Sequence, residues 1–277
     1  MPRVAVVGHV EWVRFATVDH VPAAGEIVHA GSWFELAAGG GAVAAVQLRK
    51  LAGAVAFFTA LGDDERGSAA AAQLREQGVE LEIAARREPQ REAFTFLSAD
   101  AERTITVLGP RIVPHGSDDL GWSALERVDG VYFTGGDIAA LRHARRAKVL
   151  VATTRALDTL REAAIAVDAL VASDSDAGER YVDGDVDPAP RYVVRTRGDQ
   201  GGRWEGGGRS GTWPAAALPG PAVDAYGCGD AFAAGLTFAF AGGAPIDAAV
   251  ELAARCGAAA LCGRGPYDGQ LVLAPER

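Results

Sequence analysis

Short apolar runs that alternate with helical segments occupy most of the chain. The run Val4–Val7 ends at Gly8, and helical patterns follow at 39–51 and 68–77. Continuous apolar runs are typical of parallel strands buried on both faces, because the crossover helices cover both sides of such a sheet. The pattern therefore predicts an α/β fold: a three-layer sandwich with a mostly parallel central sheet. Its further strands are expected at 55–60, 79–83, 130–133, 149–152, 169–172 and 192–196.

Two segments depart from this alternation. Residues 11–35 and 92–107 alternate polar and apolar side chains, as antiparallel strands with one exposed face do. They predict a small β-sheet that forms a lid over the carboxyl edge of the main sheet, where open α/β folds bind ligands. On composition alone, simple edge hairpins are an equal interpretation. The expected division is a core of residues 1–10, 36–90 and 109–277 and a lid of residues 11–35 and 91–108.

The last third of the chain changes character. Residues 231–241 and 246–262 are Ala-rich and predict two helices separated by Gly-Gly and Pro245. The Gly-rich segment 198–211 predicts a hairpin turn.

Composition excludes several classes of function. The net charge of −9 argues against a broad surface for nucleic acid or anionic membrane, although a local basic pocket remains compatible with it. No apolar stretch reaches bilayer length, and the N-terminal residues lack a signal-peptide pattern. With three cysteines in 277 residues, these features predict a cytoplasmic protein without nucleic-acid or membrane partners. Only Lys50 and Lys148 occur, and neither belongs to a Gly-Lys-Ser/Thr sequence, which excludes a Walker A phosphate loop.

The stretch VDAYGCGDAFAAGLTFAFAGG places Gly227, Cys228, Gly229 and Asp230 at the start of a long apolar helix. Backbone N–H groups at a helix start, together with the helix dipole, form an anion site. An aspartate there could take a proton from a hydroxyl that attacks phosphorus. Taken alone, an N-terminal cap is the commoner role for such an aspartate. A dinucleotide-binding fingerprint is disfavoured, because prolines rather than a strand precede the loop.

Two other clusters are candidate sites. Gly39, Gly40 and Gly41 open a helix and would let a polyhydroxyl substrate approach backbone amides, although on their own they are better explained by tight helix–strand packing. Asp63 and Asp64 are interpreted as a turn and a helix start rather than a metal site. The five histidines are scattered without partner spacing, and none is assigned a role.

In their order, these clusters resemble the ribokinase-like (PfkB) family of carbohydrate kinases almost from end to end. AAGGGAVAAVQLRKLAGAVAFFTALGDDERG is similar to the first family signature, in which a Gly-Gly motif leads through a helix to a Gly-Asp-Asp-x-x-Gly turn. TRGDQGG resembles the Thr-x-Gly-x-x-Gly turn near the nucleotide. DAYGCGDAF resembles the second signature, usually Asp-Thr-x-Gly-Ala-Gly-Asp, and is the most specific match.

The resemblance implies roles for the matching positions. Asp230 would deprotonate the sugar hydroxyl, and the amides of Gly227, Cys228 and Gly229 would hold the developing phosphate charge. ATP and Mg²⁺ would be the cofactors, with the metal held largely by phosphates and water and contacted indirectly by Asp176. Whether a monovalent cation is also needed stays open. The implied ATP-binding positions are Ser173, Thr196, Gly198 and Gly201, and the implied substrate-binding positions are Glu11, Val13, Gly39, Gly40, Gly41 and Asp230.

Several positions depart from the family pattern. Val13 stands where many relatives carry Asp, Glu11 where Asn is common, and Ala44 where the first signature often ends in Asn. The Asn-x-x-Glu motif is represented by Ser173 to Asp176, so that the amide is lost. A site built to bond a substrate hydroxyl discriminates strongly, so these losses imply a changed or relaxed specificity rather than ribose itself.

We therefore expect an ATP-dependent kinase that phosphorylates a hydroxymethyl group of a sugar or sugar-like small molecule. A nucleoside kinase of the same fold is the nearest alternative, because Trp12, Val13, Trp33 and Phe34 could accept a base, although lid packing or a dimer contact explains the aromatics better. A non-catalytic sugar or nucleotide sensor is another, and a dinucleotide-dependent oxidoreductase is a distant one. Pairing of exposed lid strands across subunits would produce a homodimer.

Overall fold

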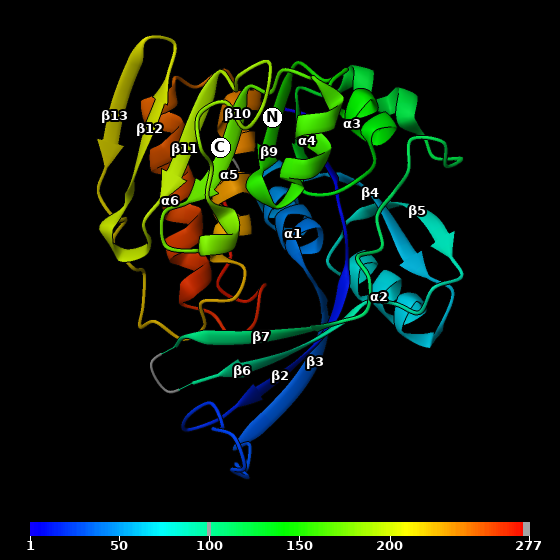
Figure 1. The fold of residues 1–277 in the computed structure, drawn as a ribbon, viewed down its shortest axis with the longest axis vertical. Coiled ribbons are helices and arrows are strands. Elements are labelled where there is room, and N and C mark those ends of the chain that lie inside the picture. Colours follow the sequence, from blue (N-terminus) through cyan, green and yellow to red (C-terminus); the bar gives the residue numbers. More distant parts are fainter. Residues whose placement is uncertain (99–100, 274–277) are drawn as a thin grey trace.

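A computed structural model describes residues 1–98 and 101–273 and contains a main sheet and a smaller one (Figure 1). From β11 to β5 the strands of the main sheet run parallel, and β12 and β13 add an antiparallel hairpin at one edge. The predicted fold class is confirmed. In spatial order the strands are β13 (Arg209–Trp213), β12 (Gly202–Gly206), β11 (Tyr192–Thr196), β10 (Ala169–Ser173), β9 (Val149–Thr153), β8 (Gly130–Phe133), β1 (Val4–Val7), β4 (Ala56–Gly62) and β5 (Glu80–Arg86).

Helices cover both faces of the main sheet, and successive strand residues alternate between two cores. In β1, Val6 packs into one core, while Ala5 and Val7 pack into the other. This alternation requires apolar side chains at every strand position, which explains the continuous apolar runs. The first core is covered by α1 (Gly40–Ala52), α2 (Glu65–Glu76), α5 (Cys228–Ala241) and α6 (Ile246–Leu261), and the second by η1 (Trp122–Arg127), α3 (Ile138–Ala144) and α4 (Leu157–Ala163).

The lid sequences form a separate four-stranded sheet with the order β3-β2-β6-β7. Figure 1 shows this sheet at one end of the main sheet, and β2 starts shortly after the carboxyl end of β1. The two predicted segments do not form independent edge hairpins, because β2 pairs in parallel with β6. The strands are β2 (Glu11–Thr17), β3 (Ser32–Ala38), β6 (Glu92–Leu97) and β7 (Arg103–Leu108). Residues 99–100 of the predicted lid and 274–277 of the predicted core lie outside the described residues.

Two local expectations have clear outcomes. Asp64 caps the start of α2 by accepting a hydrogen bond from Gly67 N, so the interpretation of this acidic pair as a helix start is confirmed. The Gly-rich segment 198–211 contains more than the expected turn, because all of β12 and the first three residues of β13 fall within it. Three consecutive glycines with positive φ, Gly206–Gly208, make the tight turn between these strands. No helix in the described ranges is long and apolar enough to cross a membrane.

Helix α5 is buried along most of its length against α1, α6 and the sheet. Its contact with α6 depends on Gly235, where an added Cβ would lie 2.8 Å from Cys256 Sγ and 3.0 Å from the Cα of Ala253. The missing side chain therefore lets the two helices approach closely, and this packing holds the N-terminus of α5 in place.

Replacing Gly235 with valine should force α5 and α6 apart and lower the free energy of unfolding by about 1–3 kcal/mol, the usual cost of overpacking. Urea unfolding followed by circular dichroism measures the change. The matched control is Ala248→Val on the exposed side of α6, which should change stability by less than about 0.5 kcal/mol. Equal free energies of unfolding for the two variants would contradict the close packing of α5 against α6 at Gly235.

Candidate active site

The N-terminus of α5 is open. Gly227, with φ of 80°, occupies the N-cap position, and no capping side chain within the described ranges accepts from the first-turn amides. A Cβ at Gly227 would lie 2.8 Å from Val43 Cγ1, whereas a Cβ at Gly229 would meet nothing within 4 Å in the described part of the chain. The amides of Cys228 and Gly229 are thus available to an anion, with the positive end of the helix dipole behind them.

Asp230 lies in the first turn of α5, three residues after the N-cap. The interpretation of Asp230 as the N-cap is therefore wrong: a glycine in the left-handed region holds that position instead. The Asp230 carboxylate projects toward the start of α1, where a Cβ at Gly40 would lie 2.7 Å from Asp230 Oδ1 and 3.0 Å from Thr134 Oγ1. Any side chain at position 40 would occupy the space beside this carboxylate.

The loop before α5 is fastened to its surroundings by Asp224, which is fully buried. Its Oδ1 accepts from Tyr226 N at 2.8 Å, and its Oδ2 accepts from Gly265 N at 2.9 Å. Tyr226 in turn accepts a hydrogen bond from Gly39 N at 3.2 Å. These contacts join the two glycine clusters predicted from the sequence, so that Gly39, Gly40 and Gly41 lie beside the start of α5.

The environment of Asp230 raises its pKa to about 6. Burial is the main cause and disfavours the charged carboxylate; the negative charges of Glu179 and Glu11 add to it, while Arg155 and Arg103 oppose it. A carboxylate whose pKa approaches neutrality is a stronger base than an exposed aspartate, yet it is still mostly ionised at pH 7. Asp230 is thereby suited to accept a proton.

Arg155, which follows β9, forms ion pairs with two acidic residues that follow β10. Its Nε donates to Glu179 Oε1 at 2.6 Å, and its Nη2 donates to Asp176 Oδ2 at 2.9 Å. Asp176 also accepts from Gly178 N at 2.8 Å. A contact between Asp176 and Mg²⁺ would have to compete with these bonds.

The described residues contain no group of three or more His, Cys, Asp or Glu side chains arranged to hold a metal ion. Glu179 nevertheless lies close enough to raise the pKa of Asp230, and Asp176 binds the same arginine, Arg155, as Glu179 does. This donor set fits a hard Mg²⁺ ion that takes most of its ligands from phosphates and water.

The positions predicted to bind ATP lie together at the carboxyl ends of neighbouring strands. Ser173 of β10 and Thr196 of β11 are paired in register. Ser173 Oγ accepts from Asp176 N at 3.1 Å, and Thr196 Oγ1 donates to Ala172 O at 3.3 Å. Gly198 and Gly201, both with positive φ, form the turn that follows β11.

The two predicted substrate positions in β2 differ in their surroundings. Glu11 is buried, and its Oε1 lies 3.0 Å from Arg91 Nε and 3.7 Å from His9 Nε2. Burial raises the pKa of Glu11, while the positive charges of Arg91, Arg111 and Arg155 oppose that shift. Val13 has no exposed surface and packs in the core, so the structure does not bring it to the surface of the site.

Residues that the sequence did not indicate complete the site: His9, Arg91, Arg111, Thr134, Arg155 and Glu179. Most follow the carboxyl end of a main-sheet strand, which is where ligands of open α/β sheets bind. That rule could have pointed to the residues after β9 and β10, but it does not say which side chains turn inward.

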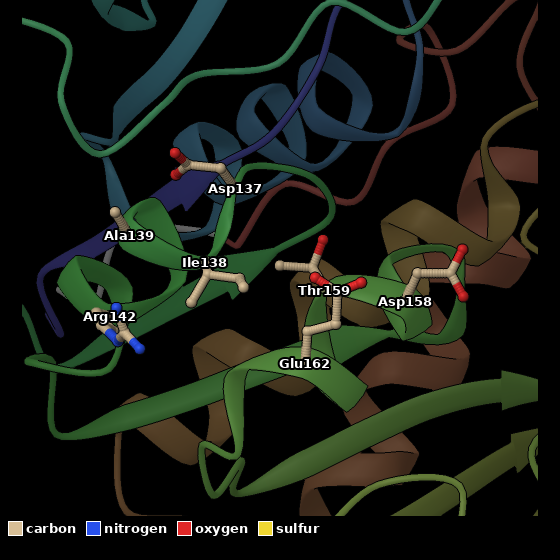
Figure 2. Close-up of a pocket in the computed structure, with 7 residues that line it drawn as sticks. All are labelled: Asp137, Ile138, Ala139, Arg142, Asp158, Thr159 and Glu162. Atoms are coloured by element: carbon tan, nitrogen blue, oxygen red, sulfur yellow. The ribbon is translucent and has the colours of Figure 1, made fainter.

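Two surface hollows in the described part of the chain can be compared with these residues. The larger, of about 500 Å³, lies between α3 and α4 and is lined by Asp137, Arg142, Thr159 and Glu162 among others (Figure 2). None of the predicted site residues lines it. The second, of about 310 Å³, includes Arg111, Arg155 and Gly178 in its lining and therefore adjoins the charged groups around Asp230.

Comparisons with known proteins agree with this geometry. Residues 1–271 match the family described as pfkB family carbohydrate kinase. The chain is 30% identical over 274 residues to an ATP-dependent ribose-1-phosphate kinase of Halopiger xanaduensis, covering 93% of this chain and 91% of that protein.

Solved structures show the same fold. A putative ribokinase from Agrobacterium tumefaciens superposes with a TM-score of 0.81 at 19% identity, covering 98% of this chain and 94% of that one. Arabidopsis thaliana ribokinase, in a complex with ribose and ATP, superposes with a TM-score of 0.74 at 19% identity, covering 98% and 96%.

Burial of an ionised carboxylate should cost stability. The pKa of Asp230 rises from 3.8 to about 6 on folding, so the folded state binds more protons than the unfolded state between these pH values. The free energy of unfolding therefore falls as pH rises through that range. At pH 7.5 the variant Asp230→Asn should therefore be more stable than wild type by about 1–3 kcal/mol, and at pH 4 much of this difference should vanish.

Denaturant unfolding at both pH values measures this effect. The exposed Glu251→Gln change on α6 is the control and should leave stability nearly unchanged at either pH. If Asp230→Asn were less stable than wild type at pH 7.5, desolvation of the charged Asp230 carboxylate would not be costing the protein stability.

Proposed function

The chain belongs to the pfkB family of carbohydrate kinases, and from this premise we propose that it transfers the γ-phosphoryl group of ATP to a hydroxymethyl group of a sugar or sugar-like small molecule. The observation that carries the proposal is the placement of Asp230, with its raised pKa, in the first turn of a helix whose N-terminal amides are open. A base and an anion site are what phosphoryl transfer to a hydroxyl requires.

In the proposed mechanism, Asp230 accepts the proton of the attacking hydroxyl. The amides around Gly227, Cys228 and Gly229, with the α5 dipole, stabilise the charge that develops on the transferred phosphoryl group. Gly40 leaves room for the hydroxyl to approach Asp230, and Glu11 is near enough to act on both Asp230 and Arg111 electrostatically. Positioning and electrostatics supply most of the rate enhancement in this class of reaction.

ATP would lie along the ends of β10 and β11, in contact with Ser173, Thr196, Gly198 and Gly201. The adjacency of these four residues supports this placement. Mg²⁺, when bound with ATP, would neutralise phosphate charge, and Asp176 and Glu179 are the carboxylates that would orient its water ligands. A requirement for ATP would also fit a cytoplasmic location, because ATP is made and used inside the cell.

The lid would close over the acceptor and exclude water. Its hairpin already reaches the loop before α5, where Ala225 N donates to Ala101 O at 3.1 Å. Phe15 of β2 also packs edge-on against Tyr226, with ring centroids 5.0 Å apart. Exposed apolar side chains on edge strands β3 and β7, including Trp33 and Leu108, support a homodimer formed through this sheet.

The alternative acceptor, a nucleoside, has weaker support. Of the lid aromatics, Trp12 is buried, Phe34 stacks on Phe15 with centroids 4.7 Å apart, and Arg264 lies over the Phe34 ring. These rings are occupied by packing, which leaves Trp33, at 68% exposure, to contact a base or a second subunit. The ribose-1-phosphate kinase activity of the Halopiger xanaduensis relative makes pentose derivatives the first acceptors to examine.

The variant Asp230→Asn should lose at least about 10²-fold in kcat, because the attacking hydroxyl loses its base, which contributes about 10²–10⁴-fold. ADP release from Mg·ATP, measured across sugars, sugar phosphates and nucleosides, tests this expectation. The affinity for ATP should be retained in the variant. A variant with full turnover would remove Asp230 from its proposed role, and a wild type that binds ATP without turning over any acceptor would favour the sensor alternative.

A further inference from the structure

Two side-chain oxygens face the same small space beside Gly40. A Cβ built on that glycine would lie 2.7 Å from Asp230 Oδ1 and 3.0 Å from Thr134 Oγ1. Both distances are in the hydrogen-bonding range, so an oxygen atom held close to this point could contact the two side chains at once. The proposed mechanism uses Asp230 and leaves the Thr134 hydroxyl without a role.

The side chain of Thr134 is held in one orientation. Thr134 directly follows β8 and is buried, and its backbone N donates to Val7 O at 2.9 Å. Its methyl group points at Gly8, because a Cβ at that glycine would lie only 2.3 Å from Thr134 Cγ2. Glycine at position 8 therefore makes room for the methyl group, and this arrangement turns the hydroxyl toward Gly40.

A buried tyrosine lies on the protein side of this hydroxyl. Burial raises the pKa of Tyr132 well above its usual range, the negative charge of Asp230 adds to the rise, and hydrogen bonds with the Thr134 and Thr153 side chains oppose it. Tyr132 therefore stays neutral. When its phenol donates to Thr134 Oγ1, the proton of Thr134 is free to point toward Gly40, since a hydroxyl can accept one hydrogen bond and donate another.

We propose that Thr134 is a further catalytic residue, which donates a hydrogen bond to the attacking hydroxyl of the acceptor while Asp230 accepts the proton of that hydroxyl. A hydroxyl oxygen has two lone pairs. Thr134 engages one of them, and the other points at the γ-phosphorus of ATP. Two fixed contacts thus orient the nucleophile, whereas a base alone would leave it free to turn about a single hydrogen bond.

This inference rests on the proposed kinase activity and adds a residue to its mechanism. The hydroxyl oxygen bonds to the γ-phosphorus, the bond from that phosphorus to the β,γ-bridging oxygen breaks, and the hydroxyl proton passes to Asp230. Thr134 keeps its own proton throughout. It changes neither the products nor the stoichiometry, and its contribution is the orientation of the acceptor.

The variant Thr134→Val removes the hydroxyl and keeps the shape, because valine can place one methyl group against Gly8 and the other where Oγ1 lies. ADP release from Mg·ATP is measured with D-ribose, D-fructose, ribose-1-phosphate and adenosine, and the acceptor that wild type turns over fastest is used for every variant. We expect kcat/KM for this acceptor to fall about 5- to 50-fold, through loss of a hydrogen bond and of orientation. KM for ATP should stay unchanged.

The pH profile separates Thr134 from the base. In Thr134→Val the plateau of kcat/KM should fall while the apparent pKa stays at the wild-type value, because Asp230 is still present. A second pair of variants, Thr134→Ser and Thr134→Ala, differs only in the hydroxyl, and the serine variant should be the more active. This pair repeats the test if Thr134→Val does not fold, and circular dichroism verifies folding of each protein.

A purely structural role for Thr134, as the partner of Tyr132, gives a different pattern. Replacing both partners of a buried hydrogen bond by apolar groups can be nearly neutral. If Thr134 served only Tyr132, the double variant Tyr132→Phe/Thr134→Val would recover the activity that Thr134→Val loses. The proposal predicts instead that the double variant stays as impaired as Thr134→Val.

The matched control is Thr59→Val in β4. Thr59 is also buried, and its hydroxyl donates to Ala60 O at 3.5 Å. The change therefore removes a buried threonine hydroxyl away from Asp230, and kcat/KM should stay at the wild-type value.

The inference is overturned if Thr134→Val keeps the wild-type kcat/KM, if the double variant recovers it, or if the serine and alanine variants are equally active. Failure of the kinase proposal has a different signature. Wild-type protein would then release no ADP with any of the four acceptors, and the role of Thr134 would fall with the activity.

Discussion

The close approach of a partly buried carboxylate to an open helix N-terminus is the constraint on which the site depends. Asp230 can lie in the first turn of α5 only because Gly227 takes the N-cap position and Gly40 leaves its side-chain space to the carboxylate. Burial raises the pKa of Asp230. Because burying a charged carboxylate is unfavourable, a rigid helix is needed to hold Asp230 in this position. Helix α5 provides it, since its apolar surface is enclosed by α1, α6 and the sheet.

The charged groups around this carboxylate come from strand ends that are distant in sequence. Glu179 and Arg155 follow β10 and β9, and Glu11 begins the first strand of the lid. Their ion pairs partly cancel one another, so that Asp230 keeps a pKa near 6 rather than a much higher one. Strand β7 of the lid brings Arg103 to this group, and the segment that follows β7 brings Arg111.

The strands and the glycine-rich start of α5 could be predicted from the sequence, because each depends on local pattern. Val4–Val7 and Gly130–Phe133 were predicted with their observed bounds, and the α5 start was recognised from its glycines. The N-cap alternative for Asp230 failed because the helix begins at Cys228, three residues before the apolar run that starts at 231. Arg111, Arg155 and Glu179 could not be predicted, since their roles follow from which strands become neighbours and not from any local spacing.

The most direct test of the central claim is the pH dependence of kcat/KM for wild type and for Glu179→Gln. The account predicts that activity rises with an apparent pKa near 6 in wild type, reporting the deprotonation of Asp230. Removing the Glu179 charge, and freeing its partner Arg155, should move this pKa downward. A profile that is flat between pH 5 and 8, or one that does not move in the variant, would contradict the assignment of Asp230 as a base tuned by its surroundings.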